Sequence, residues 1–386
     1  MAETDSGARG SALSRERLIG ALRRDFSLGA GAGWASHDPW DLLLSPFAGR
    51  LPELSPLAAR VAVQLGRRSG PGVRRLLRVP THEEPKALAD FLGAAVILAR
   101  AGEAWTGEYV SELSARLRDR AVTTRAGNAW GNAFPSASRF IAVPAHEPNI
   151  YTTTTACQAL LDDYQLTGRE ESLEHAVLGT RFILRELGSF THEGDHWLRY
   201  FANMDAPIVN VQASASSLLA RAGGIRSDDE LLQAADRAAQ TVVGRQRNDG
   251  SWTYSADGRG EFVDGFHTGF TLQGLVEYGR LRDAGPAVAV DAAVAAGFAY
   301  FKEHLLTADG HPRGFADGAA SKDGQTLAQA IQTLVVCGRE GDAAAADRIW
   351  LLGEEQLRRP RMLSLRWSVA PFALATTYLV RAFGGS

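Results

Sequence analysis

The segment VDGFHTGF places an acid and a histidine three residues apart at the start of a predicted helix. Asp264 is of a residue type that caps helix N-termini, and His267 follows it by about one helical turn. A carboxylate at this spacing can hold an imidazole in one tautomer, which makes the imidazole a general base near neutral pH. We expect Asp264 and His267 to be catalytic. The alternative is that Asp264 only caps the helix and that His267 is a satisfied core histidine.

Two tyrosines, Tyr151 and Tyr254, lie in or next to loops that precede predicted helices, and they are candidates for the acid that works with His267. Further aromatic and polar residues cluster in loops of the same kind. Such a mixture suits a sugar, because rings stack on aromatic faces and hydroxyl groups accept polar contacts. The candidate substrate-binding residues are His37, Asp38, Asp41, Trp130, Arg139, Asn203, Asp205, Trp252, Arg366 and Trp367.

Each of these candidates also has a structural interpretation. The forked side chains of Arg139 and Arg366 bind carboxylates and phosphates well, but either arginine could equally form a buried ion pair with a loop aspartate. Trp130 and Trp252 could pack in the core instead of supporting a ligand. No pair of potential ligands shows the H-x₃-H type of spacing on a helix, so we expect no metal and no cofactor.

The elements that must position these residues form a repeat. A polar loop leads into a helix rich in small residues, which ends near a glycine, and a charged amphipathic helix follows. Strand patterns are nearly absent. The small-residue helices begin near residues 85, 151, 206, 265, 322 and 367, and an earlier pair is predicted at about 12–26 (outer) and 55–69 (inner).

Small residues let helices approach one another closely, which suits the inner ring of a closed array, whereas the charged helices suit an outer ring. The pattern predicts an all-α fold, an α/α toroid or (α/α)6-like barrel of about six helical hairpins plus a closing helix. An open α-solenoid is the alternative, but its loops are short. In a toroid the inner helices all point the same way, so the long loops that carry the candidate residues gather at one mouth.

Composition limits the class of protein. With 45% hydrophobic and 22% charged residues, the chain of 386 residues resembles ordinary globular proteins, and a net charge of -3 argues against nucleic-acid binding. We expect a flexible tail at residues 1–10 and a single toroid domain at 11–386. No signal peptide is predicted and the uncharged stretch 368–380 is too short to span a bilayer, which indicates a cytoplasmic protein without membrane insertion. The oligomeric state stays open.

Several motifs carry a family resemblance: HDPWD, EPKALADF, AWGNAFPSASR, the run from DGSW to VDGFHTGF, and RWSVAPFALA. From about residue 34 to 383 the chain resembles a group of poorly characterised bacterial and archaeal α/α-toroid proteins, typically encoded near capsule, lipopolysaccharide or other glycan-assembly genes. In architecture it is similar, more distantly, to six-hairpin glycosidases, toroidal polysaccharide lyases and N-acylglucosamine 2-epimerase-type enzymes. QRNDGSW also looks like the QW repeat of triterpene cyclases, without their catalytic aspartate motif. The resemblance implies a site in the mouth of the toroid.

These features predict a carbohydrate-active enzyme acting on a sugar or glycan of uronate type, and a lyase or epimerase more than a hydrolase. Arg139 or Arg366 would hold the carboxylate and so acidify the adjacent C–H bond. A hydrolase would instead use two carboxylates, with Asp205 and either Asp264 or Asp41 as candidates.

Two other classes of function are open, and both take a small-molecule or oligosaccharide partner. The first is a terpenoid or polyketide cyclase-like tailoring enzyme, which an apolar lumen would favour and a polar lumen would exclude. The second is a non-catalytic glycan-binding protein that depends on its tryptophans.

Overall fold

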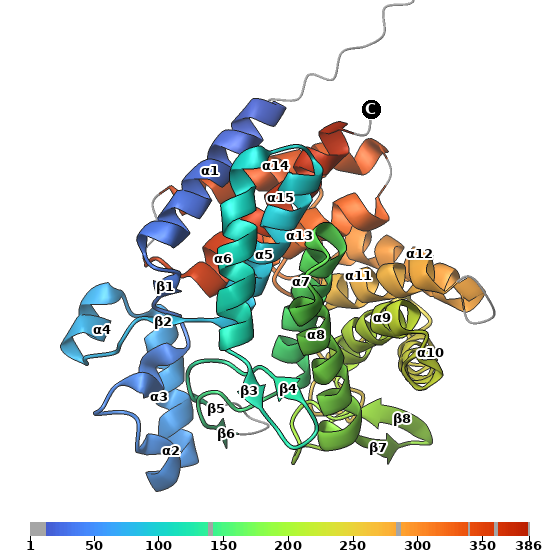
Figure 1. Ribbon diagram of the computed structural model, residues 1–386, viewed down its shortest axis with the longest axis horizontal. Coiled ribbons are helices and arrows are strands. Elements are labelled where there is room, and N and C mark those ends of the chain that lie inside the picture. The colour runs from blue at the N-terminus through green and yellow to red at the C-terminus, as the bar shows by residue number, and fades with distance from the viewer. Residues whose placement is uncertain (1–12, 138–141, 283–286, 339, 359–361, 385–386) are drawn as a thin grey trace, which may run out of the picture.

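The computed structural model describes residues 13–137, 142–282, 287–338, 340–358 and 362–384. Along these residues, helices alternate between an inner and an outer ring (Figure 1). The inner helices are α5 (Pro85–Arg100), α7 (Ile150–Thr167), α9 (Val209–Arg226), α11 (Gly265–Leu281), α13 (Gly324–Cys337) and α15 (Ala370–Gly384). The outer helices are α1 (Arg15–Gly31), α6 (Gly107–Asp119), α8 (Glu170–Phe182), α10 (Asp229–Gly244), α12 (Ala287–His304) and α14 (Glu340–Leu357).

The inner ring is closed. Each inner helix packs against the next one along the chain, and α15 packs against α5. Every outer helix covers one inner helix, and α1 covers α15, so that the two ends of the chain meet in the ring. This arrangement confirms the predicted α/α toroid and is incompatible with an open solenoid.

Small residues allow the inner helices to approach as predicted. A Cβ atom on Gly274 of α11 would lie 2.6 Å from the carbonyl carbon and oxygen of Ala213 in α9. At Gly269 of the same helix, a Cβ atom would lie 2.6 Å from side-chain atoms of Gln329 and Thr333 in α13. Larger residues at these two glycines would push neighbouring inner helices apart.

Side-chain caps fix where several inner helices start. Asn149, Asp264 and Asp323 precede α7, α11 and α13, and each accepts a hydrogen bond from a backbone N–H of the first turn. Gly168 ends α7 in the left-handed conformation, with φ 72°. These local signals are the reason that the helix starts could be placed from the sequence.

The predicted first hairpin was wrong in its inner member. The segment at 55–69 forms α3 (Pro56–Arg68), which lies outside the ring and packs with η1 (Asp41–Leu44), α2 (Leu51–Leu54) and β5 (Ser136–Ala137). Its buried face is too narrow for a ring position, because in α3 only Ala59, Val63 and Gly66 are buried. The closing helix α15 takes the sixth inner position instead. The short helices α4 (Pro71–Leu76) and η2 (Ala104–Thr106) and the π-helical turns η3 (Ile183–Leu187) and η4 (Leu365–Val369) complete the helical elements.

The long loops fold back at the N-terminal ends of the inner helices. They form two-stranded ribbons. In Figure 1 the ribbon formed by residues 35–36 and 82–83 lies on the left, above α3, and the other ribbons lie at the lower end of the view. The ribbons pair β1 (Ala35–Ser36) with β2 (His82–Glu83), β3 (Val122–Thr123) with β4 (Asn128–Ala129), β5 with β6 (Ala142–Val143), and β7 (Ser189–His192) with β8 (Asp195–Leu198). None of the helices in the described ranges combines the length and apolar character needed to cross a bilayer.

Candidate functional site at the toroid mouth

Asp264 and His267 form a hydrogen-bonded pair at the start of α11. One oxygen of Asp264 accepts from the backbone N–H of His267 and the other lies 2.7 Å from its Nδ1 atom. With the carboxylate ionised, Nδ1 carries the proton and donates it to this bond, which leaves Nε2 as the basic nitrogen. Within the described residues Nε2 has no hydrogen-bond partner, and the His267 side chain is 28% exposed. The pair can therefore meet a ligand as well as cap the helix.

Aromatic rings bring the two candidate tyrosines to this histidine. The Tyr254 ring lies 4.5 Å from the His267 ring, centre to centre, and it also stacks on Phe262, whose ring lies 6.2 Å from that of His267. Tyr151 reaches the same group through Phe270. All four predicted catalytic residues therefore belong to one continuous cluster, although they come from separate segments of the chain.

Phe266 and Phe270 connect the two halves of this cluster. The Phe266 ring lies 5.1 Å from His267 and 4.8 Å from Phe270, and Phe270 lies 5.7 Å from Tyr151. The Tyr151 hydroxyl is buried and has no hydrogen-bond partner among the described residues. Burial raises the pKa of Tyr151 well above its ordinary value, so this hydroxyl stays protonated and can act as a donor.

The two predicted acids of HDPWD, Asp38 and Asp41, form buried ion pairs with arginines that are distant in the sequence. Arg366 makes two hydrogen bonds to Asp38, at 2.7 and 2.8 Å, and Arg74 binds Asp41 at 2.8 Å. Burial opposes the charge on Arg366, but Asp38 outweighs it and the net pKa is raised. Of the two interpretations of Arg366, the structural one fits its position. His37 lies beside these ion pairs, and its Nδ1 atom is 3.4 Å from the carboxylate of Asp41.

Three buried ionisable residues at the start of α5 were missed by sequence reasoning. Glu84 precedes the helix, accepts a hydrogen bond from the backbone N–H of Ala133, and has its pKa raised to about 8 by burial. Lys86 and Asp90 pair one helical turn apart at 2.5 Å. Burial lowers the pKa of Lys86 and raises that of Asp90. The available signal was a Lys and an Asp at i, i+4 spacing in an otherwise apolar helix.

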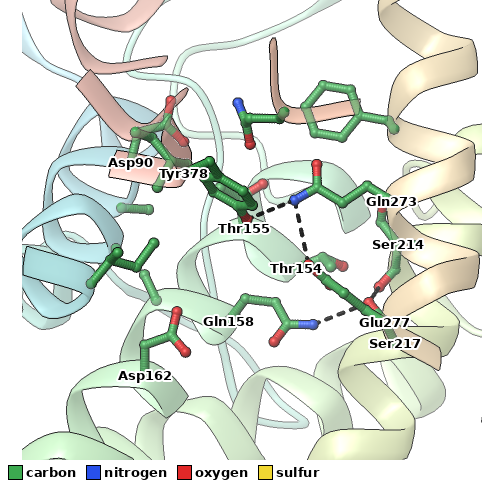
Figure 2. A pocket seen from close by; sticks show the side chains of 18 of the residues that line it. Asp90, Thr154, Thr155, Gln158, Asp162, Ser214, Ser217, Gln273, Glu277 and Tyr378 are labelled. Carbon is green, nitrogen blue, oxygen red and sulfur yellow. Dashed lines mark hydrogen bonds between the residues drawn. The ribbon is translucent and has the colours of Figure 1, made fainter. Parts of the chain in front are cut away.

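A cavity of about 570 Å³ runs along the toroid axis behind the aromatic cluster. Lys86, Asp90 and Thr154 lie at its buried end, and the exposed residues Arg100, Arg280 and Arg381 lie at the C-terminal ends of the inner helices. Figure 2 shows hydroxyl, amide and carboxyl groups of the lining, contributed by Thr154, Thr155, Gln158, Asp162, Ser214, Ser217, Gln273, Glu277 and Tyr378. Apolar residues such as Ile97, Phe270 and Leu374 also line the cavity, so this mixed lining suits a ligand that carries hydroxyl or carboxyl groups on an apolar frame.

The remaining predicted residues lie in different environments. Trp130 and Trp252 are core residues, at 0% and 3% exposure, and their indole N–H groups donate to the backbone oxygens of Leu117 and Val242. Their predicted role as ligand platforms does not fit this burial. Both rings fill space between an inner and an outer helix. The position of a tryptophan in the sequence does not show whether its ring lies there or at the mouth of the toroid.

Trp367 is partly exposed and donates to Asp323 at 2.7 Å, next to a second cavity of about 510 Å³. Asn203 and Asp205 are exposed, and Asp205 pairs with Arg199 at 2.6 Å. These three positions remain accessible to a ligand. Arg139 lies outside the described residues.

Comparisons with solved structures agree with the fold. A possible member of the GH105 family from Salmonella enterica matches with a TM-score of 0.65 at 11% identity, over 100% of both chains. The GH76A α-1,6-mannanase of a Salegentibacter species matches with a TM-score of 0.55 at 13% identity, and the cellobiose 2-epimerase of Bacillus thermoamylovorans with 0.57 at 11%; each match covers 78% of this chain and 90% of the other. No family model and no curated protein matches the sequence.

Proposed function

We propose that the protein is a carbohydrate-active enzyme that transfers protons to and from a sugar at the mouth of the toroid. The observation that carries this proposal is the Asp264–His267 pair, with Nε2 of His267 unbonded among the described residues and Tyr254 beside it. The similarity in fold to sugar epimerases and glycoside hydrolases supports the substrate class.

In the proposed reaction, Nε2 of His267 removes a proton from a sugar carbon next to a carboxylate or carbonyl group. In a lyase, the electrons of the broken C–H bond form a C=C bond, the C–O bond to the leaving sugar breaks, and a tyrosine gives its proton to the leaving oxygen. In an epimerase, a proton returns to the same carbon from the opposite face. Tyr254 and Tyr151 are the proposed acids.

The carboxylate of a uronate needs a cation, and Arg366 is already bound by Asp38. Arg139 is therefore the proposed partner of that carboxylate. A charged contact at this point would stabilise the carbanion-like transition state more than the ground state, which is the condition for a rate increase.

The three alternatives have less support. For a hydrolase, Asp41 is buried against Arg74 and Asp264 is bonded to His267, which leaves Asp205 as the exposed acid of the predicted set. The buried Lys86 and Asp90 and the carboxyl group of Glu277 in the axial cavity argue against a cyclase that holds a hydrocarbon. A non-catalytic glycan-binding protein would need exposed tryptophans, whereas of the predicted set Trp130 and Trp252 are buried and Trp367 is partly exposed.

The test is proton exchange in D₂O. The purified protein is incubated with uronate oligosaccharides and with neutral disaccharides, and deuterium at the sugar carbons and absorbance of unsaturated uronates are measured. Because proton abstraction is common to lyases and epimerases, either signal supports the proposal, whereas hydrolysis without exchange contradicts it.

The matched variants are His267→Ala and His175→Ala, since His175 is a partly exposed residue of the outer helix α8. Loss of a positioned base lowers the rate by about 10²- to 10⁴-fold, so His267→Ala should lose turnover while His175→Ala keeps it. A fully active His267→Ala enzyme would refute the role of His267.

A further inference from the structure

Apolar side chains are exposed together on the small helices outside the ring. On α3, Leu57, Val61 and Leu65 follow one another at i, i+4 and i+8 and are 62%, 51% and 63% exposed. The neighbouring turn and helices add more exposed apolar residues. We call the whole group the α2–α4 patch: Phe47, Leu54, Leu57, Val61, Leu65, Val73 and Leu76.

This clustering differs from the rest of the surface. Across the described ranges, the large hydrophobic residues exposed outside the α2–α4 patch are Leu28, Leu281 and Phe315, which belong to three different segments. Single exposed apolar residues are normal on soluble proteins, whereas a stripe of them along one helix, with more in the adjoining segments, is typical of an interaction site. The opposite face of α3 already packs through Ala59 and Val63, so folding does not require the exposed face.

The charge around the patch is almost entirely positive. Residues 46–79 contain seven arginines and one acid, Glu53, although the whole chain has a net charge of -3. Arg74 is buried against Asp41. In the part of the chain that the structure describes, Arg60, Arg68 and Arg75 form no ion pair. An apolar helix stripe flanked by arginines is the pattern of a helix that lies in the surface of an anionic membrane.

We infer that the α2–α4 patch docks on the surface of an anionic lipid bilayer. The apolar side chains enter the boundary between headgroups and acyl chains, and the arginines contact lipid phosphates. A second copy of this chain is a poorer occupant, since pairing two patches would bring arginines against arginines. The inference does not depend on the proposed reaction.

Docking would also orient the molecule. Arg67 of α3 lies over the Trp40 ring at 4.1 Å, and Trp40 contacts Trp367 at the start of η4, 5.8 Å between ring centres. The α2–α4 patch therefore belongs to the mouth end of the toroid. A protein docked by this patch holds its mouth close to the membrane surface.

The experiment is vesicle flotation with the full chain. Vesicles of phosphatidylcholine with phosphatidylglycerol are compared with vesicles of phosphatidylcholine alone, at low and high salt. Binding to the anionic vesicles that weakens with salt is expected, because salt screens the arginines. Binding equally strong to both vesicle types, or no binding to anionic vesicles at low salt, would overturn the inference.

Two triple variants separate the apolar and charged contributions. Arg60→Gln/Arg68→Gln/Arg75→Gln should weaken binding to anionic vesicles by about a hundredfold, and Leu57→Gln/Val61→Gln/Leu65→Gln by about tenfold or more. Leu28→Gln and Arg185→Gln are the controls and should bind normally, since both residues are exposed on outer-ring elements. Circular dichroism verifies that each variant is folded.

Light scattering on the same samples tests whether a second copy of the chain covers the α2–α4 patch instead. A dimer that the leucine variant disrupts, together with absent vesicle binding, would assign the patch to a second copy and contradict membrane docking. Unchanged vesicle binding by both triple variants would equally contradict it.

Discussion

Glu84 is a carboxyl group that the fold keeps protonated near neutral pH. It is 1% exposed, and one of its oxygens accepts a hydrogen bond from Ala133. Its other oxygen has no hydrogen-bond partner among the described residues. Burial, the largest influence, raises its pKa to about 8, and the nearby Arg366 only partly opposes this. A buried acid of this kind makes stability depend on pH.

We predict that this dependence disappears in Glu84→Gln. In the unfolded chain Glu84 loses its proton near pH 4.3, but in the folded protein it does so near pH 8. The contribution of Glu84 to stability is therefore fully present below about pH 4.3 and is lost as the pH rises to about 8. The free energy of unfolding of the wild type should fall relative to the variant by up to about 1.4 kcal/mol per pH unit in this window.

Urea denaturation of both proteins between pH 4 and 9 measures this difference. Above pH 8 the two curves should run parallel, because Glu84 is then ionised in both states. Curves that are parallel across the whole range would show that Glu84 is not buried in its neutral form.

At the scale of elements, the inner helices depend on glycine where they cross most closely. Gly274 faces the backbone of Ala213, which cannot move without shifting α9. Gly224, near the C-terminal end of α9, has no atom within 4 Å of the position that a Cβ would take. The two glycines are thus a matched pair, one in a helix contact and one in open space.

We predict opposite effects of alanine at these two positions. Gly274→Ala should destabilise the fold by about 1–3 kcal/mol through overpacking. Gly224→Ala should stabilise it by about 0.5–1 kcal/mol, because alanine loses less backbone freedom in a helix. Chemical denaturation at one pH measures both changes. Equal effects at the two sites would contradict the close α9–α11 contact.

At the scale of the whole molecule, closure of the ring makes its parts interdependent. The last inner helix α15 packs on α13, α5 and α1, and so it joins the two ends of the chain. In an open solenoid each repeat contacts only its neighbours, and the loss of a terminal repeat is local. In a closed ring such a loss exposes apolar faces at both sides of the gap.

We predict that truncation after residue 364, which removes η4 and α15, abolishes cooperative unfolding of the whole domain. Buried side chains such as Phe372 and Val380 would be lost, and the faces of α5 and α13 that they cover would meet water. Thermal unfolding followed by circular dichroism measures cooperativity. A truncated protein that keeps a sharp transition and loses only the helicity of α15 would indicate an open array.

The sequence by itself determined the features that depend on neighbours along the chain. Small-residue helices, their glycine ends and their polar caps predicted the rings, and the spacing of Asp264 and His267 predicted a contact within a single helical turn. Local hydrogen bonds of this kind follow from helix geometry alone. Lys86 and Asp90 are four residues apart and so can also pair within a helix, but only their burial shows that the pair is chemically unusual.

The tertiary structure decided which distant residues meet and which side chains reach water. Asp38 and Arg366 are 328 residues apart and bind each other because the ring closes. Phe266 and Phe270 join Tyr151 to His267 across two inner helices, while Trp252 is covered and α3 stays outside the ring. These outcomes depend on the packing of whole helices. A side chain is buried by residues from other segments once the ring has closed, so its burial cannot be read from its own segment.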